Sequence, residues 1–403
     1  MSGHEPAGDE GGRAGRQAWV EIAVALSVST VLLAGVAWWA WPRGHRAGSS
    51  DRSGVQAGRL DRFVGDRVCA GCHPGEAASH RRSGHSHTLQ RADGAELSRR
   101  LDGRTAVDPE SPETTWSFHA RNGPLTVERR AGAEVERFVV DYLFGSGQHA
   151  LTFMTLLDRD PAHPSGLELR MTYYRATDSF KITPGQTADA PEGQLTAAGR
   201  VYSTAEVVHC FGCHASATSA ADPNKLDTAT MIPNVACERC HGFGRAHVEA
   251  ARRGEAGGVI HFGARRETAD WQMRLCGQCH RYPGILEGIG VPQVHPSKIR
   301  PDNPEIVRFQ PVGLMQSRCY RESRGRLTCV TCHDPHARAS TDQAAYDAAC
   351  LSCHGGPRQT ACRLSKSSGC VGCHMPRTDA GQGVLFTDHW VRLPKGSGTK
   401  TRP

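Results

Sequence analysis

The sequence is short of the residues from which an ordinary hydrophobic core is built. Aromatic residues make up 6% of its 403 positions and hydrophobic residues 38%, whereas glycine and proline are plentiful, at 45 and 23. A chain of this length usually forms two or three domains, but side chains alone would give each of them a thin core. We therefore expect another apolar component to supply much of the buried surface.

One pattern of cysteine and histidine is abundant. Cys-x-x-Cys-His occurs seven times, and we number these motifs 1 to 7 in chain order. The pattern is the attachment signature of c-type haem, whose vinyl groups bond to the two thiols while the imidazole ligates the iron. Seven motifs predict seven covalently bound haem c groups and their iron. The residues of motifs 1 to 7 are Cys69, Cys72 and His73; Cys210, Cys213 and His214; Cys237, Cys240 and His241; Cys276, Cys279 and His280; Cys329, Cys332 and His333; Cys350, Cys353 and His354; and Cys370, Cys373 and His374.

Zinc and disulfides are the other common uses of paired cysteines. Two Cys-x-x-Cys pairs make one tetrahedral zinc site, but seven pairs leave one over, and zinc needs no histidine after every pair. Sixteen cysteines would suit disulfides, yet disulfides do not explain the histidines either. Cys319 and Cys362 lie outside the motifs, and they either pair with each other or remain buried free thiols.

The net charge of the chain is small once the haems are counted. The formal charge is +7, and each ferric haem adds about −1 because two propionates outweigh the iron porphyrin, so seven haems bring the total to roughly zero. The basic pairs Arg129-Arg130, Arg252-Arg253 and Arg265-Arg266 are then propionate partners or solvated surface, with docking of an acidic redox protein as the alternative. No nucleic-acid partner is indicated.

One apolar run near the N-terminus is long enough to cross a bilayer. Residues 22–41 carry no charge over 20 positions, and Trp38, Trp39 and Trp41 end the run as interfacial aromatics would. A cleaved signal peptide is the alternative, although its apolar region is shorter, about 7–15 residues. We expect residues 19–41 to be a single-pass anchor in a bacterial inner membrane, preceded by a cytoplasmic tail over residues 1–18. Because haem is attached outside that membrane, the haem-binding part would be periplasmic.

The spacing of the motifs divides the rest of the chain. We expect a linker over 42–60, a first haem module over 61–95, a β-rich insertion over 96–205, a six-haem cluster over 206–395 and a tail over 396–403. The predicted fold class is a multihaem cytochrome c in which short helices and loops surround the haems. Short helices are predicted at 246–253, 268–275 and 341–349, with helix-compatible content at 75–92.

The β-rich insertion is predicted from alternating and β-branched segments. These lie at 115–118, 125–129, 136–143 and 167–173, and Asn122-Gly123-Pro124 supplies a turn between the first two.

Each haem iron has a second axial position that a distal side chain can fill. Bis-histidine ligation gives low potentials, and Met375 is badly placed, directly after a proximal histidine. A histidine close to a motif, such as His209, His247 or His336, cannot easily bend onto the same haem, but it can reach a neighbouring one. The distal candidates are His85 (or His87), His149, His209, His247, His295, His336 and His389.

Several of these segments resemble a known family. Motif 1 followed by Ser83-Gly84-His85-Ser86, Leu327 to His336, Gly372 to Arg377 and Phe386 to His389 are similar to cytochrome c-554-like multihaem proteins and to relatives that often carry tetratricopeptide repeats. No such repeat is visible in this chain. The resemblance implies electron transfer through stacked haems, with distal ligands at His85, His149, His247, His336 and His389.

Two functions follow from the motifs. The first is an electron conduit of closely packed bis-histidine haems, held by its membrane anchor between a quinol-linked donor and a soluble or outer redox protein. The alternative is a multihaem oxidoreductase that converts a small nitrogen or sulfur compound at one five-coordinate haem. The Cys-x-x-Cys-Lys motif of pentahaem nitrite reductases is absent, and seven distal candidates for seven irons favour the conduit.

Overall fold

The chain divides into two compact units, Met1–Arg52 and Ser53–Pro403, and every residue that the structure describes lies in the second. The predicted anchor over 19–41, the tails over 1–18 and 396–403, and His295 fall outside the described residues. Within the described ranges, no helix is both long and apolar enough to span a bilayer. The computed structural model describes residues 60–93, 96–121, 123–147, 149–187, 195–220, 222, 224–255, 268–281, 299–356, 362, 368–379 and 385–393.

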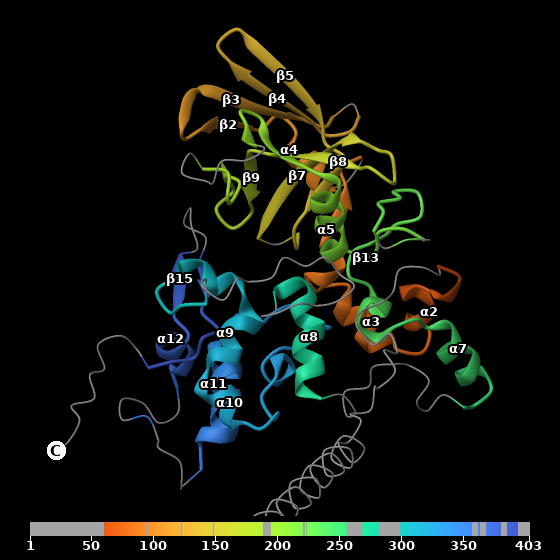
Figure 1. The fold of residues 1–403 in the computed structure, drawn as a ribbon, viewed down its shortest axis with the longest axis vertical. Coiled ribbons are helices and arrows are strands. Elements are labelled where there is room, and N and C mark those ends of the chain that lie inside the picture. Colours follow the sequence, from red (N-terminus) through yellow and green to blue (C-terminus); the bar gives the residue numbers. More distant parts are fainter. Residues whose placement is uncertain are drawn as a thin grey trace, which may run out of the picture. The chain divides into compact units, whose positions relative to one another are not determined.

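Most of residues 105–202 form two antiparallel sheets (Figure 1). In the four-stranded sheet, strands that are consecutive in the sequence are also neighbours, in the order β2-β3-β4-β5. The eight-stranded sheet has the order β1-β6-β7-β8-β12-β11, and in addition β9 pairs with β7 and β10 pairs with β9. The first sheet contains β2 (Thr105–Asp108), β3 (Ser111–His119), β4 (Thr126–Ala131) and β5 (Glu134–Val139); the second contains β1 (Leu89–Arg91), β6 (Tyr142–Phe144), β7 (Ala150–Asp158), β8 (Ser165–Leu169), β9 (Met171–Tyr174), β10 (Ser179–Ile182), β11 (Leu195–Thr196) and β12 (Gly199–Tyr202).

Two expected strands are each divided in the structure. The segment 136–143 is not one strand, because the chain leaves the small sheet after β5 and enters the large one at β6. Val140 donates its backbone N–H to Leu125 O (2.8 Å) and Asp141 donates to Met154 O (2.9 Å), so the two residues join the sheets. The segment 167–173 is interrupted at Arg170, whose buried guanidinium lies 2.6 Å from the Asp108 carboxylate.

The helix-compatible segment 75–92 also differs from the expectation. It contains the short helix α3 (Pro74–His80), the 3-10 turn η2 (His85–His87) and strand β1. The strand forms because Leu89 is buried against the large sheet and pairs with Phe144. Tertiary burial of one leucine therefore overrides the local helical preference.

Two apolar clusters form the core of the β-rich part. The larger one includes Trp116 and Phe118 from the small sheet with Phe153 from the large sheet, all fully buried. The second cluster is centred on Phe211, which makes edge-on ring contacts with Tyr142 and Phe144 at centroid distances of 5.0 Å each. Phe211 lies between the cysteines of motif 2, so it packs that motif directly against the sheet.

Short helices and turns hold the motifs. Five of the helices end at the histidine of a motif, at His214, His241, His280, His354 and His374. The five helices that end at a motif histidine are α5 (Thr204–His214), α6 (Cys237–His241), α8 (Ala269–His280), α11 (Gln343–His354) and α12 (Cys370–His374). The other helices are α2 (Asp66–Ala70), α4 (Glu96–Leu101), α7 (Arg245–Arg252), α9 (Gln310–Gln316) and α10 (Arg318–Glu322), and the 3-10 turns are η1 (Leu60–Arg62), η4 (Pro304–Arg308) and η5 (Cys329–Thr331). Two short strand pairs complete this part: β13 (Ala215–Ala217) with β14 (Ile232–Pro233), and β15 (Arg377–Asp379) with β16 (Leu385–Thr387).

The starts of the longer helices follow from capping side chains. Ser203 and Glu206 form a capping box at α5, and Thr268 Oγ1 accepts the backbone N–H of Trp271 (3.2 Å) at α8. Asp342 caps α11 by accepting from Ala344 N at 2.9 Å, so it is the residue directly before the helix. The predicted helices at 246–253, 268–275 and 341–349 are confirmed, and the last two continue through their motifs.

Candidate haem-binding site

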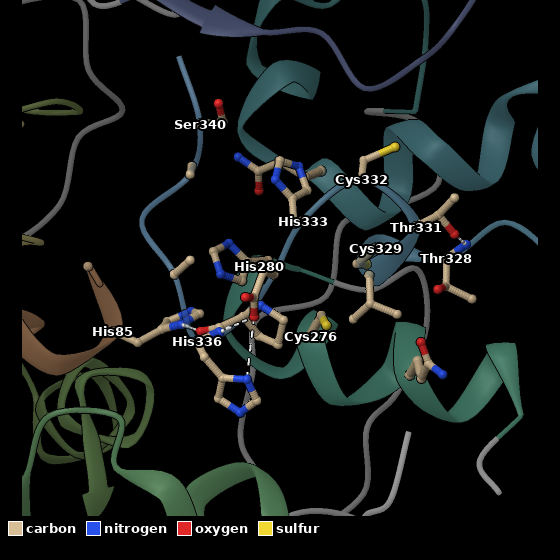
Figure 2. A pocket seen from close by; sticks show the side chains of 18 of the residues that line it. His85, Cys276, His280, Thr328, Cys329, Thr331, Cys332, His333, His336 and Ser340 are labelled. Carbon is tan, nitrogen blue, oxygen red and sulfur yellow. Dashed lines mark hydrogen bonds and ion pairs between the residues drawn. The ribbon is translucent and has the colours of Figure 1, made fainter. Parts of the chain in front are cut away.

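One large cavity brings all seven motifs together. Its volume is ≈3710 Å³, and every motif residue except Cys210 lines it. A pocket for one small ligand measures roughly 300–1,000 Å³, and an equal division among seven motifs gives about 530 Å³ each. The cavity therefore has room for several large cofactors, each beside its own motif. Figure 2 shows the part of its wall that contains motifs 4 and 5.

The cysteines of the cavity are available for covalent attachment. All sixteen are free thiols, including the two of every motif, which is the state that thioether formation requires. Cys319 and Cys362 do not pair with each other. Cys319 is half-buried and Cys362 is exposed, so of the two alternatives for them the free thiols hold, although Cys362 is not buried.

Four motif histidines face a second histidine from elsewhere in the chain. The ring centroids are 6.4 Å apart for His73 and His247, 6.2 Å for His280 and His85, 5.8 Å for His241 and His336, and 6.2 Å for His333 and His389. With metal–nitrogen bonds of about 2 Å and centroids about 1 Å beyond each nitrogen, two imidazoles on one metal ion have centroids about 6 Å apart. The observed separations fit one iron between each pair.

Each of these four second histidines follows a different motif from the one that it faces. His85 follows motif 1 but faces motif 4, and His247 follows motif 3 but faces motif 1. In the same way, His336 follows motif 5 and faces motif 3, while His389 follows motif 7 and faces motif 5. The pairs therefore link motifs that are distant in sequence.

Backbone carbonyls fix the orientation of several imidazoles. The Nδ1 atoms of His214 and His374 lie 2.8 Å from Thr88 O and 2.9 Å from Arg392 O. His389 Nδ1 similarly lies 3.0 Å from Thr387 O. A carbonyl only accepts, so Nδ1 must carry the proton, and Nε2 keeps the lone pair that a metal needs.

Burial favours the neutral form of four of these imidazoles. It lowers the pKa of His214, His333 and His389 below the ordinary value. Burial, with a smaller contribution from His85, lowers the pKa of His280 to about 4. A neutral imidazole is the form that ligates a metal ion, so these side chains need no deprotonation at neutral pH.

Neighbouring motifs touch one another directly. Motifs 2 and 4 lie side by side, because the Cys213 thiol donates to Gln278 O and the Cys279 thiol to Cys213 O, both at 3.7 Å. Motif 5 contacts the helix of motif 4, where Cys329 Sγ lies 3.5 Å from Met273 Sδ. Helices α2 and α6, of motifs 1 and 3, are in contact, and so are α11 and α12, of motifs 6 and 7.

Two buried charged residues between the cysteines of motif 3 were not anticipated. The Glu238 carboxylate accepts the backbone N–H groups of Val64 (3.0 Å), Gly65 (2.9 Å) and Gly244 (2.8 Å). Arg239 donates to Gly212 O at 3.0 Å and so joins motif 3 to motif 2. The sequence does contain a signal for these two residues. Motif 3 has charged side chains between its cysteines, where most other motifs have small or apolar residues.

Asp347 accepts backbone hydrogen bonds at motif 7, as Glu238 does beside motifs 1 and 3. It is buried on α11, and its carboxylate accepts from Gly369 N (2.6 Å) and Val371 N (3.2 Å) at the start of α12. Although burial opposes ionisation, these backbone donors lower the pKa of Asp347 below its ordinary value.

The remaining distal candidates have different positions. His149 is exposed but lines the cavity, whereas His209, on α5, is not among the lining residues. His87 lines a separate pocket and donates to or accepts from Ser86 Oγ (2.8 Å), so between the two alternatives it is His85 that faces a motif. Among the ring contacts of described residues, none pairs His214, His354 or His374 with a second histidine.

The chain is similar to a known family over part of its length. The family model described as cytochrome c554 and c-prime matches residues 174–242, which contain motifs 2 and 3. A solved structure, the crystal structure of the outer cell wall cytochrome OcwA, is similar at 13% identity with a TM-score of 0.43, covering 82% of this chain and 80% of that one. No curated protein matches the chain.

Proposed function

We propose that this chain, a cytochrome c554-like multihaem protein, is an electron conduit built from seven covalently bound haem c groups. Haem iron supplies reversible one-electron transfer, and the protein supplies ligation, spacing and burial. The observation that carries the proposal is the set of four histidine pairs across the cavity. Fully ligated iron suits electron transfer, because it offers no open position to a substrate.

The residues of the seven motifs would hold the haems. The thiols of each Cys-x-x-Cys pair form the thioether links, and the motif histidine is the proximal ligand. We assign His247, His85, His336 and His389 as the distal ligands of motifs 1, 4, 3 and 5, in that order. His149, His209 and His295 are the candidates for the other three motifs.

The contacts between motifs support a spatial order of haems that differs from their order in the sequence. Motif 1 adjoins motif 3, and motif 4 adjoins both motif 2 and motif 5, while motif 6 adjoins motif 7. The crossed histidines reinforce this arrangement, since a segment that follows one motif ligates the haem of another. Spacing between haems would then be fixed by the fold and not by sequence order.

The location of the conduit follows from the chemistry of its cofactor. Haem c is attached outside the bacterial cytoplasmic membrane, so we place residues after about 42 on that side. We further propose that residues 19–41 anchor the chain, and that it accepts electrons from a quinol-linked donor and passes them to a soluble or outer redox protein.

An oxidoreductase is the second candidate. It is favoured by His214, His354 and His374, which face no second histidine ring among the described residues. A haem on one of these motifs with an open distal side would admit a small nitrogen or sulfur compound.

Protein-film voltammetry of the full-length haem-loaded protein separates the two candidates. The conduit predicts reversible waves whose height does not change when nitrite, hydroxylamine or tetrathionate is added. A catalytic current with any of these compounds would overturn the conduit and establish the oxidoreductase. The matched control is the His247→Ala variant, whose opened iron shows how a vacant distal position responds to the same compounds.

A further inference from the structure

A second pocket, separate in its chemistry from the haem cavity, gathers five arginines. Its volume is ≈780 Å³, and Arg81, Arg82, Arg100, Arg175 and Arg338 line it. They come from the end of α3, from α4, from the turn after β9 and from the segment after His336. Glu96 is the carboxylate among the lining residues, and it lies 3.5 Å from Arg100 on the same helix.

The pocket concentrates positive charge beyond what its own carboxylate offsets. Five guanidinium groups against one carboxylate leave an excess of about +4, and like charges gathered in one concavity repel one another. Arg81 and Arg338 make no ion pair with any residue that the structure describes. An anion in the pocket would relieve this repulsion.

Arg175, one of the two arginines of this pocket that also line the haem cavity, is held in place. Arg175 donates from Nη1 to Gly147 O at 2.6 Å, and its backbone N–H donates to His149 O at 2.8 Å. Gly147 has φ +69° and lies against His87, where an added Cβ would be 3.4 Å from His87 Cβ. The loop therefore presents Arg175 with most of its guanidinium donors still available.

An independent observation is the hydroxyl of Ser146, which also lines this pocket. Ser146 Oγ is buried and has no hydrogen-bond partner among the described residues. A buried hydroxyl without a partner is costly. Because Ser146, Arg175, Ala337 and Arg338 line the haem cavity as well, the pocket shares a wall with it.

We propose that this pocket binds an oxyanion group, in which carboxylate or inorganic oxygens accept from the arginines and from Ser146 Oγ. The planar guanidinium fork matches such groups in pairs of hydrogen bonds. Two sources share this chemistry: the propionate of a haem in the adjoining cavity, or a dissolved oxyanion from solution. The inference concerns anion binding and stands whether or not the haems form a conduit.

The test uses the full haem-loaded protein and sodium sulfate as the probe. Isothermal titration at constant ionic strength compares the wild type with Arg81→Gln/Arg338→Gln and with Ser146→Ala. The control Arg121→Gln/Arg137→Gln removes the same charge from exposed arginines outside both pockets. If the anion is dissolved, sulfate binds the wild type, and its affinity falls at least tenfold in the pocket double variant while the control is unchanged.

Resonance Raman spectra of the same proteins without sulfate test the other source. If a propionate occupies the pocket, sulfate shows no Arg81- or Arg338-dependent binding, and the propionate bending mode shifts in the pocket variant but not in the control. The proposal is overturned if sulfate binding is absent or equal in the pocket variant and control, and the propionate mode is also the same in both.

Discussion

His247 on α7 lies face to face with His73 of motif 1, with ring centroids 6.4 Å apart and planes at 25° to each other. The whole β-rich insertion lies between the two residues in the sequence, so only the fold brings them together. Their separation suits one iron between two imidazoles. Three further pairs have similar centroid separations, of 6.2, 5.8 and 6.2 Å, although the angles between their planes differ. Ligation by crossed histidines is therefore the centre of the proposed function.

The first prediction concerns that pair. The His247→Ala variant removes one imidazole without altering the thiols of motif 1, so one haem in seven should change from low-spin to high-spin. Electron paramagnetic resonance of the oxidised protein measures this as a new high-spin ferric signal. The control His163→Ala, an exposed histidine beside Asp160, should leave the spectrum unchanged; an unchanged spectrum in His247→Ala would remove His247 as a ligand.

The second prediction concerns the stability of the segment before motif 1. Glu238→Ala deprives three backbone N–H groups of their acceptor. The Gly244 N–H is buried and the bonds of Val64 and Gly65 are partly buried, and a buried donor without a partner costs about 1–3 kcal/mol. The free energy of unfolding should fall by about 3–5 kcal/mol in denaturant titrations of protein with full haem content. Glu255→Ala, at an exposed carboxylate beside Arg253, should cost less than about 0.5 kcal/mol. Equal losses in the two variants would count against this role.

A third prediction is that the free energy of unfolding depends on pH because of Glu168. Burial raises the pKa of this carboxyl above its ordinary value of 4.5, although it accepts hydrogen bonds from Tyr202 (2.8 Å) and Gln186 (2.9 Å). Because the folded pKa is raised, the contribution of Glu168 to stability is complete below pH 4.5 and is lost as pH rises through the folded pKa. Arg200, which lies near enough to favour the charged form, opposes this shift only in part.

The Glu168→Gln variant should remove that loss. Its free energy of unfolding relative to wild type should rise with pH, by about 1.4 kcal/mol for each unit by which the folded pKa exceeds 4.5. Thermal unfolding across a pH series measures the difference. Glu113→Gln should show the opposite trend, because the Ser111 hydroxyl lowers the pKa of Glu113. A difference between Glu168→Gln and wild type that stays flat from acid to neutral pH would refute the assignment.

The fourth prediction tests the junction of β8 and β12. Gly199 has φ +146°, and an added Cβ would lie 2.1 Å from Glu168 O and 2.9 Å from Arg170 N. Gly199→Ala should therefore destabilise the β-rich insertion by about 3 kcal/mol, seen as a lower unfolding midpoint. Gly75→Ala in α3, where an added Cβ meets nothing within 4 Å, should be neutral or stabilising by up to about 1 kcal/mol. Similar midpoints for the two variants would show that the strand junction can relax.

The sequence indicates the residues of the candidate site more directly than it indicates the fold. The motifs and their attachment chemistry are local patterns, and His247 and His336 stood out because a histidine so near a motif must reach another haem. The motif that each would face could not be predicted, since that depends on contacts such as Asp66 with the backbone of Cys237. These join residues far apart in the chain.

The strand boundaries show the same limit. The alternation over 136–143 predicts one strand, but Leu125, directly before β4, accepts from Val140 N, and Met154, in β7, accepts from Asp141 N. The choice between His85 and His87 likewise depends on the turn at η2, where Pro335 O accepts from His85 Nδ1 at 3.2 Å. Local periodicity carries no information about such partners.

Mössbauer spectroscopy of the oxidised, ⁵⁷Fe-enriched full-length protein tests the central claim most directly, because it counts the iron in each spin and ligation state. Crossed ligation by His247, His85, His336 and His389 predicts that at least four of seven irons are low-spin ferric with two imidazole ligands. A low-spin fraction below four-sevenths would contradict the account.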